Sequence, residues 1–251
     1  MQPESVAEAA EILRSAQRVV AFTGAGVSAE SGVPTFRGAG GLWEGHPVEE
    51  LASPRGFYAD PVKVWRFYEE RRRNLANVKP NPAHRVLAGW QERFPRYAVV
   101  TQNVDGLHQA AGARGVLELH GSIWRVRCLG CGREREERTV PLPRVPPLCS
   151  KCGAMERPGV VWFGEFLPEA VMAAAFAAIE KCEVLVVVGT SAVVYPAAAL
   201  PAITKNSGGL VIEINLEPTD ITSYADASLF GPAGEMLPAL WNAAVRIPKA
   251  L

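Results

Sequence analysis

Short apolar runs alternate with amphipathic stretches along most of the chain. Residues 4–15 carry apolar side chains at helical spacing, which predicts an amphipathic opening helix. Four apolar runs, each followed by a polar loop, predict buried strands at residues 19–22, 97–101, 184–189 and 210–214. A helical pattern at residues 169–181 precedes the third run. Strands and helices in this alternation favour an α/β domain built on a parallel sheet.

The alternation breaks between residues 125 and 158. This interval is rich in arginine, glutamate and proline, and it holds four of the five cysteines. We therefore predict a small module at residues 125–158, inserted into a larger domain that residues 1–124 and 159–251 form together.

Composition and charge exclude several classes of protein. Of 251 residues, 48% are apolar and 21% are charged, which is ordinary for a globular chain and excludes global disorder. Twenty-six basic residues balance 26 acidic ones, so no general field attracts nucleic acid or an anionic membrane. We expect direct binding to neither.

Two further features bear on membranes and export. The uncharged run at residues 184–204 is long enough to cross a bilayer, but Gly189, Pro196 and Pro201 interrupt it. We interpret this run as a strand, a loop and the start of a helix. The first five residues have neither a basic region nor an apolar one, so they show no secretory signal. These observations predict a soluble protein of the cytoplasm.

Four cysteines have the spacing of a metal site. Two residues separate the members of each pair and 17 residues separate the pairs, which are Cys128 with Cys131 and Cys149 with Cys152. Four thiolates on two tight turns can complete a tetrahedron around zinc and leave no position for water, so the metal would be structural. Disulfides and a redox motif are the alternatives. An intracellular setting disfavours the first, and the paired arrangement disfavours the second. Cys182 is expected to be a buried small hydrophobe.

The first predicted strand runs into a glycine-rich loop. Residues 24–29 read Gly-Ala-Gly-Val-Ser-Ala, close to a dinucleotide-binding fingerprint with alanine in its last position. The amides of such a loop can hold a pyrophosphate, and a plain strand-to-helix turn is the alternative. Polar residues also close the later strands at 189–191 and 215–217, where ligands of open α/β sheets lie. Glu217 could bind a ribose diol or be an ordinary loop carboxylate.

Polar side chains also crowd the loop after the second predicted strand. Residues 101–108 read Thr-Gln-Asn-Val-Asp-Gly-Leu-His, and a further histidine, at position 120, precedes the cysteine-rich module. The candidate bases are the four histidines of the chain: His46, His84, His108 and His120. A neutral imidazole suits proton abstraction near neutral pH, and a structural histidine bonded to the backbone is the alternative.

Together these motifs resemble the sirtuin family. They occur in the family's usual order over residues 20–240: Gly24-Ala25-Gly26-Val27-Ser28, Pro34-Thr35-Phe36-Arg37, Gln102-Asn103-Val104-Asp105, His120-Gly121, the paired cysteines, Phe163-Gly164-Glu165, Gly189-Thr190-Ser191 and Asn215-Leu216-Glu217. Sirtuins are NAD-dependent protein lysine deacylases. The resemblance implies a Rossmann-type parallel sheet domain with an inserted zinc-ribbon module, NAD as cofactor and one structural zinc ion. Thr35 stands where many sirtuins carry aspartate, and there the chain resembles the branch associated with desuccinylation.

The resemblance also implies which residues bind NAD. The phosphates would contact the glycine loop, the nicotinamide half would meet the loop after the second strand, and the adenosine half would lie on the later strand ends. The residues concerned are Gly24, Ala25, Gly26, Ser28, Thr35, Phe36, Arg37, Gln102, Asn103, Asp105, Gly189, Thr190, Ser191, Asn215, Glu217 and Ala233.

The implied reaction assigns catalytic roles to Asn103 and His120. The acyl-lysine carbonyl attacks the ribose as nicotinamide departs, and Phe36 shields that centre from water. His120 then acts as general base for a ribose hydroxyl. The products are free lysine, nicotinamide and O-acyl-ADP-ribose. The implied partner is an acylated protein or peptide, added as a strand along residues 161–165, with contacts to Val161, Trp162 and Phe163, and near residues 193–195.

One helix face bears on the acyl group that is removed. Tyr68 and Arg71 lie three residues apart and are therefore neighbours on a helix. A phenol hydroxyl and a guanidinium can bind the terminal carboxylate of a succinyl, malonyl or glutaryl group. Taken alone, this charged segment would be an ordinary solvated face. The pair matches the Tyr-x-x-Arg pattern of desuccinylating sirtuins, so the resemblance favours desuccinylase and demalonylase activity together with deacetylation.

Other functions could use the same parts. A mono-ADP-ribosyltransferase would cleave the same cofactor with a different acceptor. A non-catalytic NAD-sensing scaffold would need only the fold, and the intact set of His120, Asn103 and Asp105 disfavours it. A hydride-transferring dehydrogenase fits least, because a metal held by four cysteines has no open position.

Overall fold

The computed structural model describes residues 3–35 and 48–245, and its larger part is built on a six-stranded parallel sheet. The strands lie in the order β3-β2-β1-β7-β8-β9, and every neighbouring pair is parallel. Their bounds are β1 Arg18–Thr23, β2 Arg96–Thr101, β3 Leu117–Glu118, β7 Val184–Val188, β8 Leu210–Asn215 and β9 Ala227–Phe230. The four predicted strands are confirmed as β1, β2, β7 and β8. The strand order is that of the doubly wound dinucleotide-binding fold, which confirms the predicted fold class.

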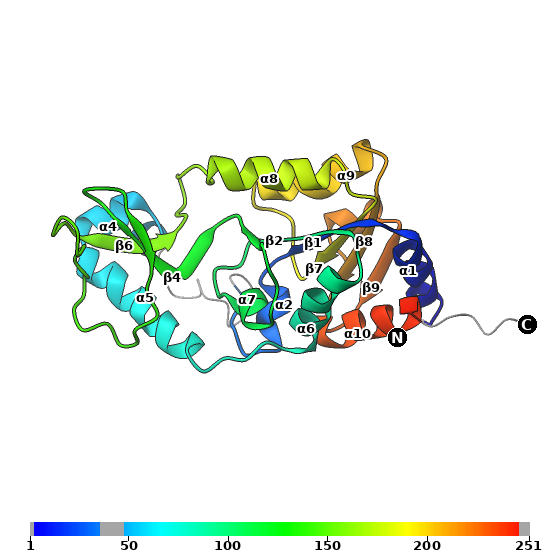
Figure 1. The fold of residues 1–251 in the computed structure, drawn as a ribbon, viewed down its shortest axis with the longest axis horizontal. Coiled ribbons are helices and arrows are strands. Elements are labelled where there is room, and N and C mark those ends of the chain that lie inside the picture. Colours follow the sequence, from blue (N-terminus) through cyan, green and yellow to red (C-terminus); the bar gives the residue numbers. More distant parts are fainter. Residues whose placement is uncertain (1–2, 36–47, 246–251) are drawn as a thin grey trace, which may run out of the picture.

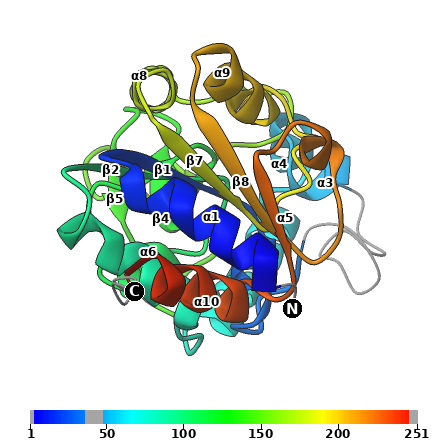
Figure 2. The same cartoon turned by 90° about the vertical axis from the view of Figure 1, so that its right-hand side faces the viewer.

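Helices cover both faces of this sheet, as Figure 1 and, at a right angle, Figure 2 show. One face carries α8 (Glu169–Ile179) and α9 (Leu200–Asn206), and the other carries α1 (Pro3–Ser15), α6 (Pro82–Gly89) and α10 (Ala233–Val245). The predicted opening helix is confirmed as α1, and the predicted helix at 169–181 is α8. Residues 184–204 form β7, a loop and the start of α9, as predicted. In the described ranges, no helix is both long and apolar enough to cross a membrane.

Alternate side chains of the central strands point to opposite helical layers. On β1, Val19 and Ala21 pack in the cluster that contains α1 and α10 residues, whereas Val20 and Phe22 pack in the cluster on the α8 side. All five residues of β7 are buried. Because these strands are covered on both faces, their sequences are continuous apolar runs with no polar alternation.

A second lobe lies at one end of the molecule, on the left of Figure 1. It contains a three-stranded antiparallel sheet in the order β5-β4-β6. Its elements are α3 Val48–Leu51, α4 Pro54–Ala59, α5 Pro61–Leu75, β4 Gly121–Cys128, β5 Glu134–Glu136 and β6 Glu156–Val160. Apolar side chains of α4 and α5 pack with those of β4 and β6 in one cluster. Two separate segments of the chain, 48–75 and 121–160, therefore share one core.

Buried polar contacts fasten α5 to the cysteine-rich segment. Arg72 is 1% exposed, and its Nη2 donates to the carbonyl oxygens of Glu137 at 2.8 Å and Thr139 at 2.9 Å. Trp65 Nε1 donates to the carbonyl oxygen of Glu156 at 2.8 Å. A buried donor that loses its partner costs free energy, so these contacts stabilise the lobe only while both segments are in place.

Candidate active site

The polar loops identified in the sequence gather at the carboxyl edge of the parallel sheet. Each follows the end of a strand: residues 24–28 follow β1, 102–105 follow β2, 189–191 follow β7, 217 follows β8 and 233 follows β9. The strand order reverses between β1 and β7. Doubly wound proteins bind their ligands in the crevice that such a reversal opens, so this edge is the candidate site.

Two glycine loops pack against each other at the reversal. Gly26 N donates to Gly189 O at 2.8 Å, and Gly24 N donates to Val188 O at 3.0 Å. A Cβ on Gly24 would lie 2.6 Å from the Cβ of Thr190, and a Cβ on Gly26 would lie 2.7 Å from the Cα of Gly189. The two backbones therefore touch directly, which requires glycine on both sides. The amides of Gly24 and Gly26 are used in this contact, so these two glycines serve the close approach of the loops.

Ser28, Asn103 and Asp105 form a buried network beneath these loops. Ser28 Oγ donates to Asp105 Oδ2 at 2.8 Å and accepts from Asn103 Nδ2 at 3.2 Å. Asn103 Nδ2 also donates to Gly24 O at 3.0 Å, which joins the loop after β2 to the loop after β1. Asn103 Oδ1 is buried and has no partner among the described residues. A buried acceptor left in this way indicates a ligand or water as its partner, so the site fits the nicotinamide half of NAD.

Hydrogen bonds around Thr190 join three strand ends. Gln102 Nε2 donates to Thr190 Oγ1 at 2.9 Å, and Asn215 Nδ2 donates to Thr190 O at 3.0 Å. These bonds bring the loops after β2, β7 and β8 together. The predicted contacts to the two halves of NAD therefore belong to one connected surface.

His120 lies in the two-residue junction between β3 and β4, where the chain passes from the parallel sheet to the second lobe. Its Nδ1 lies 2.9 Å from the carbonyl oxygen of Gln102, so Nδ1 carries the proton and Nε2 keeps a free lone pair. Burial lowers the pKa of His120, and the bond to the Gln102 carbonyl raises it by less. The imidazole is therefore neutral at neutral pH, in a tautomer suited to a general base.

Two other histidines lie deep beneath the same loops. His84 and His108 are buried, with ring centroids 5.0 Å apart, and His108 Nε2 lies 2.9 Å from Thr23 Oγ1. Burial lowers the pKa of His84 to about 4 and that of His108 to about 3. Both are therefore neutral members of the buried network. Of the three described histidines, His120 alone is partly exposed.

A buried carboxylate orders the chain beside the predicted adenosine contacts. Glu213 on β8 is 1% exposed and accepts hydrogen bonds from the hydroxyls of Thr219, Thr222 and Ser228. These bonds hold the segment that follows β8. Glu213 could not be identified from the sequence, because one glutamate in an apolar strand gives no sign of the three hydroxyls that meet it in the fold.

Tyr68 and Arg71 lie side by side on α5, as their spacing predicts. The Arg71 guanidinium carbon is 5.7 Å from the centroid of the Tyr68 ring. Burial raises the pKa of Tyr68, although the Arg71 charge lowers it in part. The same charge lowers the pKa of Asp105, while burial raises it by more. Trp162 Nε1 donates to Tyr68 Oη at 2.9 Å, and the neighbouring Val161 N donates to the His120 carbonyl oxygen, so α5 packs against the segment that contacts His120.

Residues 161–165 continue from β6 along the candidate site. Val161 N donates to the carbonyl oxygen of His120 at 2.9 Å, and Phe163 N donates to that of Ala52 at 2.9 Å. Trp162 is buried and Phe163 is 49% exposed. The segment predicted to contact a peptide is therefore bonded directly to the residue that carries the candidate base.

The other predicted site residues differ in exposure. Ala25 and Thr35 are half-buried, Ser191 and Glu217 are exposed, and Ala233 is buried at the start of α10. Phe36 and Arg37 lie outside the described residues.

The four paired cysteines converge in the second lobe. Their sulfur atoms all lie within 4.8 Å of one another, and no disulfide forms among the described cysteines. The Sγ atoms of Cys128 and Cys152 are 3.4 Å apart, and those of Cys131 and Cys149 are 3.8 Å apart. A zinc tetrahedron with bonds of about 2.3 Å has edges of about 3.8 Å, so the four sulfurs fit one zinc ion. With four thiolate ligands the metal is structural, as the spacing predicts.

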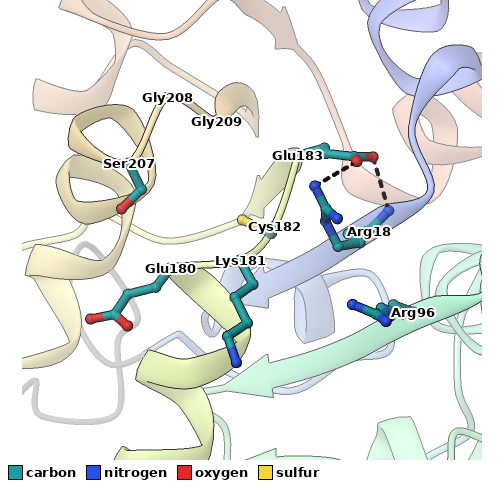
Figure 3. Close-up of a pocket in the computed structure, with 9 residues that line it drawn as sticks. All are labelled: Arg18, Arg96, Glu180, Lys181, Cys182, Glu183, Ser207, Gly208 and Gly209. Carbon is teal, nitrogen blue, oxygen red and sulfur yellow. Dashed lines mark hydrogen bonds and ion pairs between the residues drawn. The ribbon is translucent and has the colours of Figure 1, made fainter.

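A separate pocket of about 320 Å³ lies at the opposite, amino-terminal edge of the sheet. Figure 3 shows Arg18 beside Glu183 there. The Arg18 guanidinium and the Glu183 carboxylate form an ion pair at 2.8 Å. Cys182 lines this pocket but is 7% exposed, and burial raises the pKa of its thiol. The prediction that Cys182 is a buried hydrophobe is confirmed.

Fold and site together define a dinucleotide-binding α/β protein with a four-cysteine module. Comparison with known proteins shows the family, because residues 24–196 match the Sir2 family. The chain is 54% identical over 231 residues to NAD-dependent protein deacylase 2 of Pyrobaculum aerophilum, covering 92% of both chains. The chain therefore belongs to the Sir2, or sirtuin, family, as its motifs predict.

Two solved structures resemble this one closely. A Sir2 homologue in complex with NAD is 46% identical, with a TM-score of 0.87 over 97% of this chain and 94% of that chain. A Sir2 protein bound to a myristoylated histone peptide is 37% identical, with a TM-score of 0.77 over 96% of each chain. The candidate site thus belongs to a fold that has been observed with both the dinucleotide and an acylated peptide.

Proposed function

We propose that this protein removes acyl groups that end in a carboxylate, such as succinyl and malonyl, from lysine side chains in an NAD-dependent reaction, and acetyl groups as well. The observation that carries the proposal is the Tyr68–Arg71 pair on α5, whose Tyr68 hydroxyl is hydrogen-bonded to Trp162 beside the predicted peptide segment. The acyl-lysine would come from a protein or peptide.

The coarser activity follows from the family. The protein is an NAD-dependent protein deacylase of the Sir2 family, and curated relatives at about half sequence identity bear that name. The four-cysteine site would hold a structural zinc ion through Cys128, Cys131, Cys149 and Cys152.

Bound NAD supplies a glycosidic bond between nicotinamide and ribose that can be broken. The glycine loops after β1 and β7 would hold its phosphates, and the unpartnered Oδ1 of Asn103 would accept a hydrogen bond from its nicotinamide half. His120 would take a proton at Nε2, because its Nδ1 is bonded to the Gln102 carbonyl. The peptide would lie along residues 161–165, whose backbone already contacts the His120 carbonyl.

The acyl selectivity rests on two neighbouring donors, the buried Tyr68 and the half-buried Arg71. Tyr68 is 2% exposed, and its raised pKa keeps the phenol protonated and able to donate. Arg71 keeps its charge even when burial lowers its pKa. A carboxylate carried in on the acyl chain would receive a charge-assisted hydrogen bond from each. An acetyl group has no carboxylate and would receive neither of these hydrogen bonds.

The test compares matched succinyl-lysine and acetyl-lysine peptides. We expect Arg71→Met to lower kcat/KM for the succinyl peptide by about a hundredfold, as the loss of a charge-assisted bond predicts, and to change the acetyl value much less. Arg66→Met is the matched control, because Arg66 lies on the same helix and is exposed. Mass spectrometry of the peptides, with and without NAD, measures both reactions.

Equal losses on the two peptides would remove the carboxylate role and leave the deacylase assignment in place. Label from NAD that stays on protein, without loss of acyl mass from the peptide, would instead indicate ADP-ribosyl transfer.

A further inference from the structure

The hydroxyl of Tyr68 has a partner on the other segment of the second lobe. Trp162 Nε1 donates a hydrogen bond to Tyr68 Oη at 2.9 Å, across 94 positions of the sequence. Both side chains are buried, Tyr68 at 2% and Trp162 at 3% exposure. Among the described residues, the Trp162 indole is the hydrogen-bond partner of this hydroxyl.

The chemistry of the two groups fixes the direction of the bond. An indole N–H donates and cannot accept, whereas a phenol hydroxyl has one proton to donate and can also accept. The hydroxyl therefore accepts from Trp162, and its own proton has to point away from the indole. If an acceptor stood at that position in place of the indole, the phenol would donate its proton to that acceptor and could not donate it to a substrate.

Three contacts hold the indole in this orientation. The Arg157 guanidinium lies 3.5 Å from the centroid of the Trp162 ring, and Arg157 is itself bonded to Glu165 through both Nη1 and Nη2. Glu165 Oε2 also accepts from the Trp162 backbone N–H at 2.8 Å. The Phe57 ring packs on the indole with centroids 5.1 Å apart. A stacked, buried ring with its backbone also bonded has little freedom to turn its N–H away.

We propose that Trp162 is a positioning residue for acyl selectivity: its indole N–H directs the Tyr68 hydroxyl proton toward the carboxylate of the acyl group, beside Arg71. The proposal rests on the proposed desuccinylase function and adds to it the residue that makes Tyr68 a donor. Trp162 acts here through Tyr68 and makes no contact with the carboxylate itself.

The test removes the indole N–H and keeps an aromatic ring. We expect Trp162→Phe to lower kcat/KM for a succinyl-lysine peptide by about tenfold, the lower end of the range for one hydrogen bond to a charged group, mainly through KM. The value for the acetyl peptide should fall less, since that substrate offers no carboxylate. The ratio of the two values therefore reports the positioning role apart from any contact of Trp162 with the peptide. Trp65→Phe is the matched control, because it removes a buried indole N–H bond in the same core at a position that does not contact the Tyr68 hydroxyl.

A double-mutant cycle separates the proposed role from a packing defect. If Trp162 acts through the phenol proton, Trp162→Phe has no further effect on succinyl selectivity once Tyr68→Phe has removed the hydroxyl. Replacing Trp162 with benzothienylalanine, in which sulfur takes the place of the indole N–H, gives the same selectivity loss without a cavity. Zinc content and the thermal midpoint report whether each variant is folded.

The outcomes distinguish this inference from the function it rests on. Selective loss in Tyr68→Phe and Arg71→Met, but none in Trp162→Phe, overturns the positioning role alone. Additive losses in the double variant overturn it as well. No selective loss in any of the three variants overturns the proposed carboxylate specificity itself.

Discussion

At the scale of single residues, the pKa of His120 predicts how the deacylase activity depends on pH. Burial lowers its pKa below the ordinary value of 6.5. In the proposed mechanism the neutral form acts as the base, so activity should be present above the folded pKa and be lost as the pH falls through it. We expect the acid limb of kcat/KM to have its midpoint below pH 6.5, measured with an acetyl-lysine peptide at saturating NAD.

The variant His120→Ala separates proton abstraction by His120 from the preceding cleavage of NAD. Deacylation should fall by about a hundredfold or more, the usual contribution of a general base, and the acid limb should disappear. Exchange of labelled nicotinamide into NAD in the presence of acylated peptide precedes proton abstraction and should persist. An acid limb centred above pH 6.5, or one unchanged in the variant, would contradict the assignment.

Several site residues could be predicted from local sequence alone. Tyr68 and Arg71 are three positions apart on one helix, so their contact follows from the helical repeat. The contacts of Trp162 with Tyr68 and of His84 with His108 could not be assigned, because each joins separate segments of the chain. The contacts of Glu213 depend on how the chain turns after β8. A buried hydrogen bond between residues far apart in the chain depends on the fold as a whole.

At the scale of elements, the contact between the two glycine loops can be tested. A Cβ on Gly189 would lie 2.4 Å from Val27 N, and Gly189 has φ +59°. We expect Gly189→Ala to destabilise the protein by about 1–3 kcal/mol and to raise KM for NAD, because the loops have to separate. Denaturant unfolding and NAD titration of the rate measure the two effects.

Gly208 provides a matched control for backbone strain. It has φ +82°, but a Cβ there meets nothing within 4 Å. Gly208→Ala should therefore cost stability from its φ angle alone and leave KM for NAD unchanged. Equal rises in KM for both variants would show that the loop contact has no special role.

The elements were predictable to the extent that local patterns determine them. β1 and β7 were identifiable because each is a short, uninterrupted apolar run. β3 and β9 were not, since the first has two residues and the second has four, with the polar Ser228 among them. The packing of α5 on β4 and β6 depends on residues such as Arg72, whose carbonyl partners carry no side-chain signal in the sequence.

At the scale of the whole molecule, the four-cysteine site should affect activity although its residues do not contact the active site. β4 runs from Gly121, next to His120, to Cys128 in the metal cluster. A structural zinc ion contributes on the order of 10 kcal/mol to such a small unit, so chelation should unfold the second lobe and abolish deacylation. Metal analysis, circular dichroism and peptide turnover measure these changes together.

Two cysteine variants complete this test. Cys131→Ala should lose both metal and activity, whereas Cys182→Ala should keep both, because Cys182 lies at the opposite edge of the sheet. Full turnover by metal-free protein would show that the lobe folds without the ion.

The junction between β3 and β4 has a consequence for motion. Leu119 and His120 are the entire link between the two sheets at this point, and the ring of His120 is tethered to the Gln102 carbonyl on the parallel side. A rotation of one sheet relative to the other has to pass through the torsion angles of these two residues. Such a rotation would turn the backbone that carries the His120 imidazole, so the orientation of this ring and the angle between the two sheets are expected to change together.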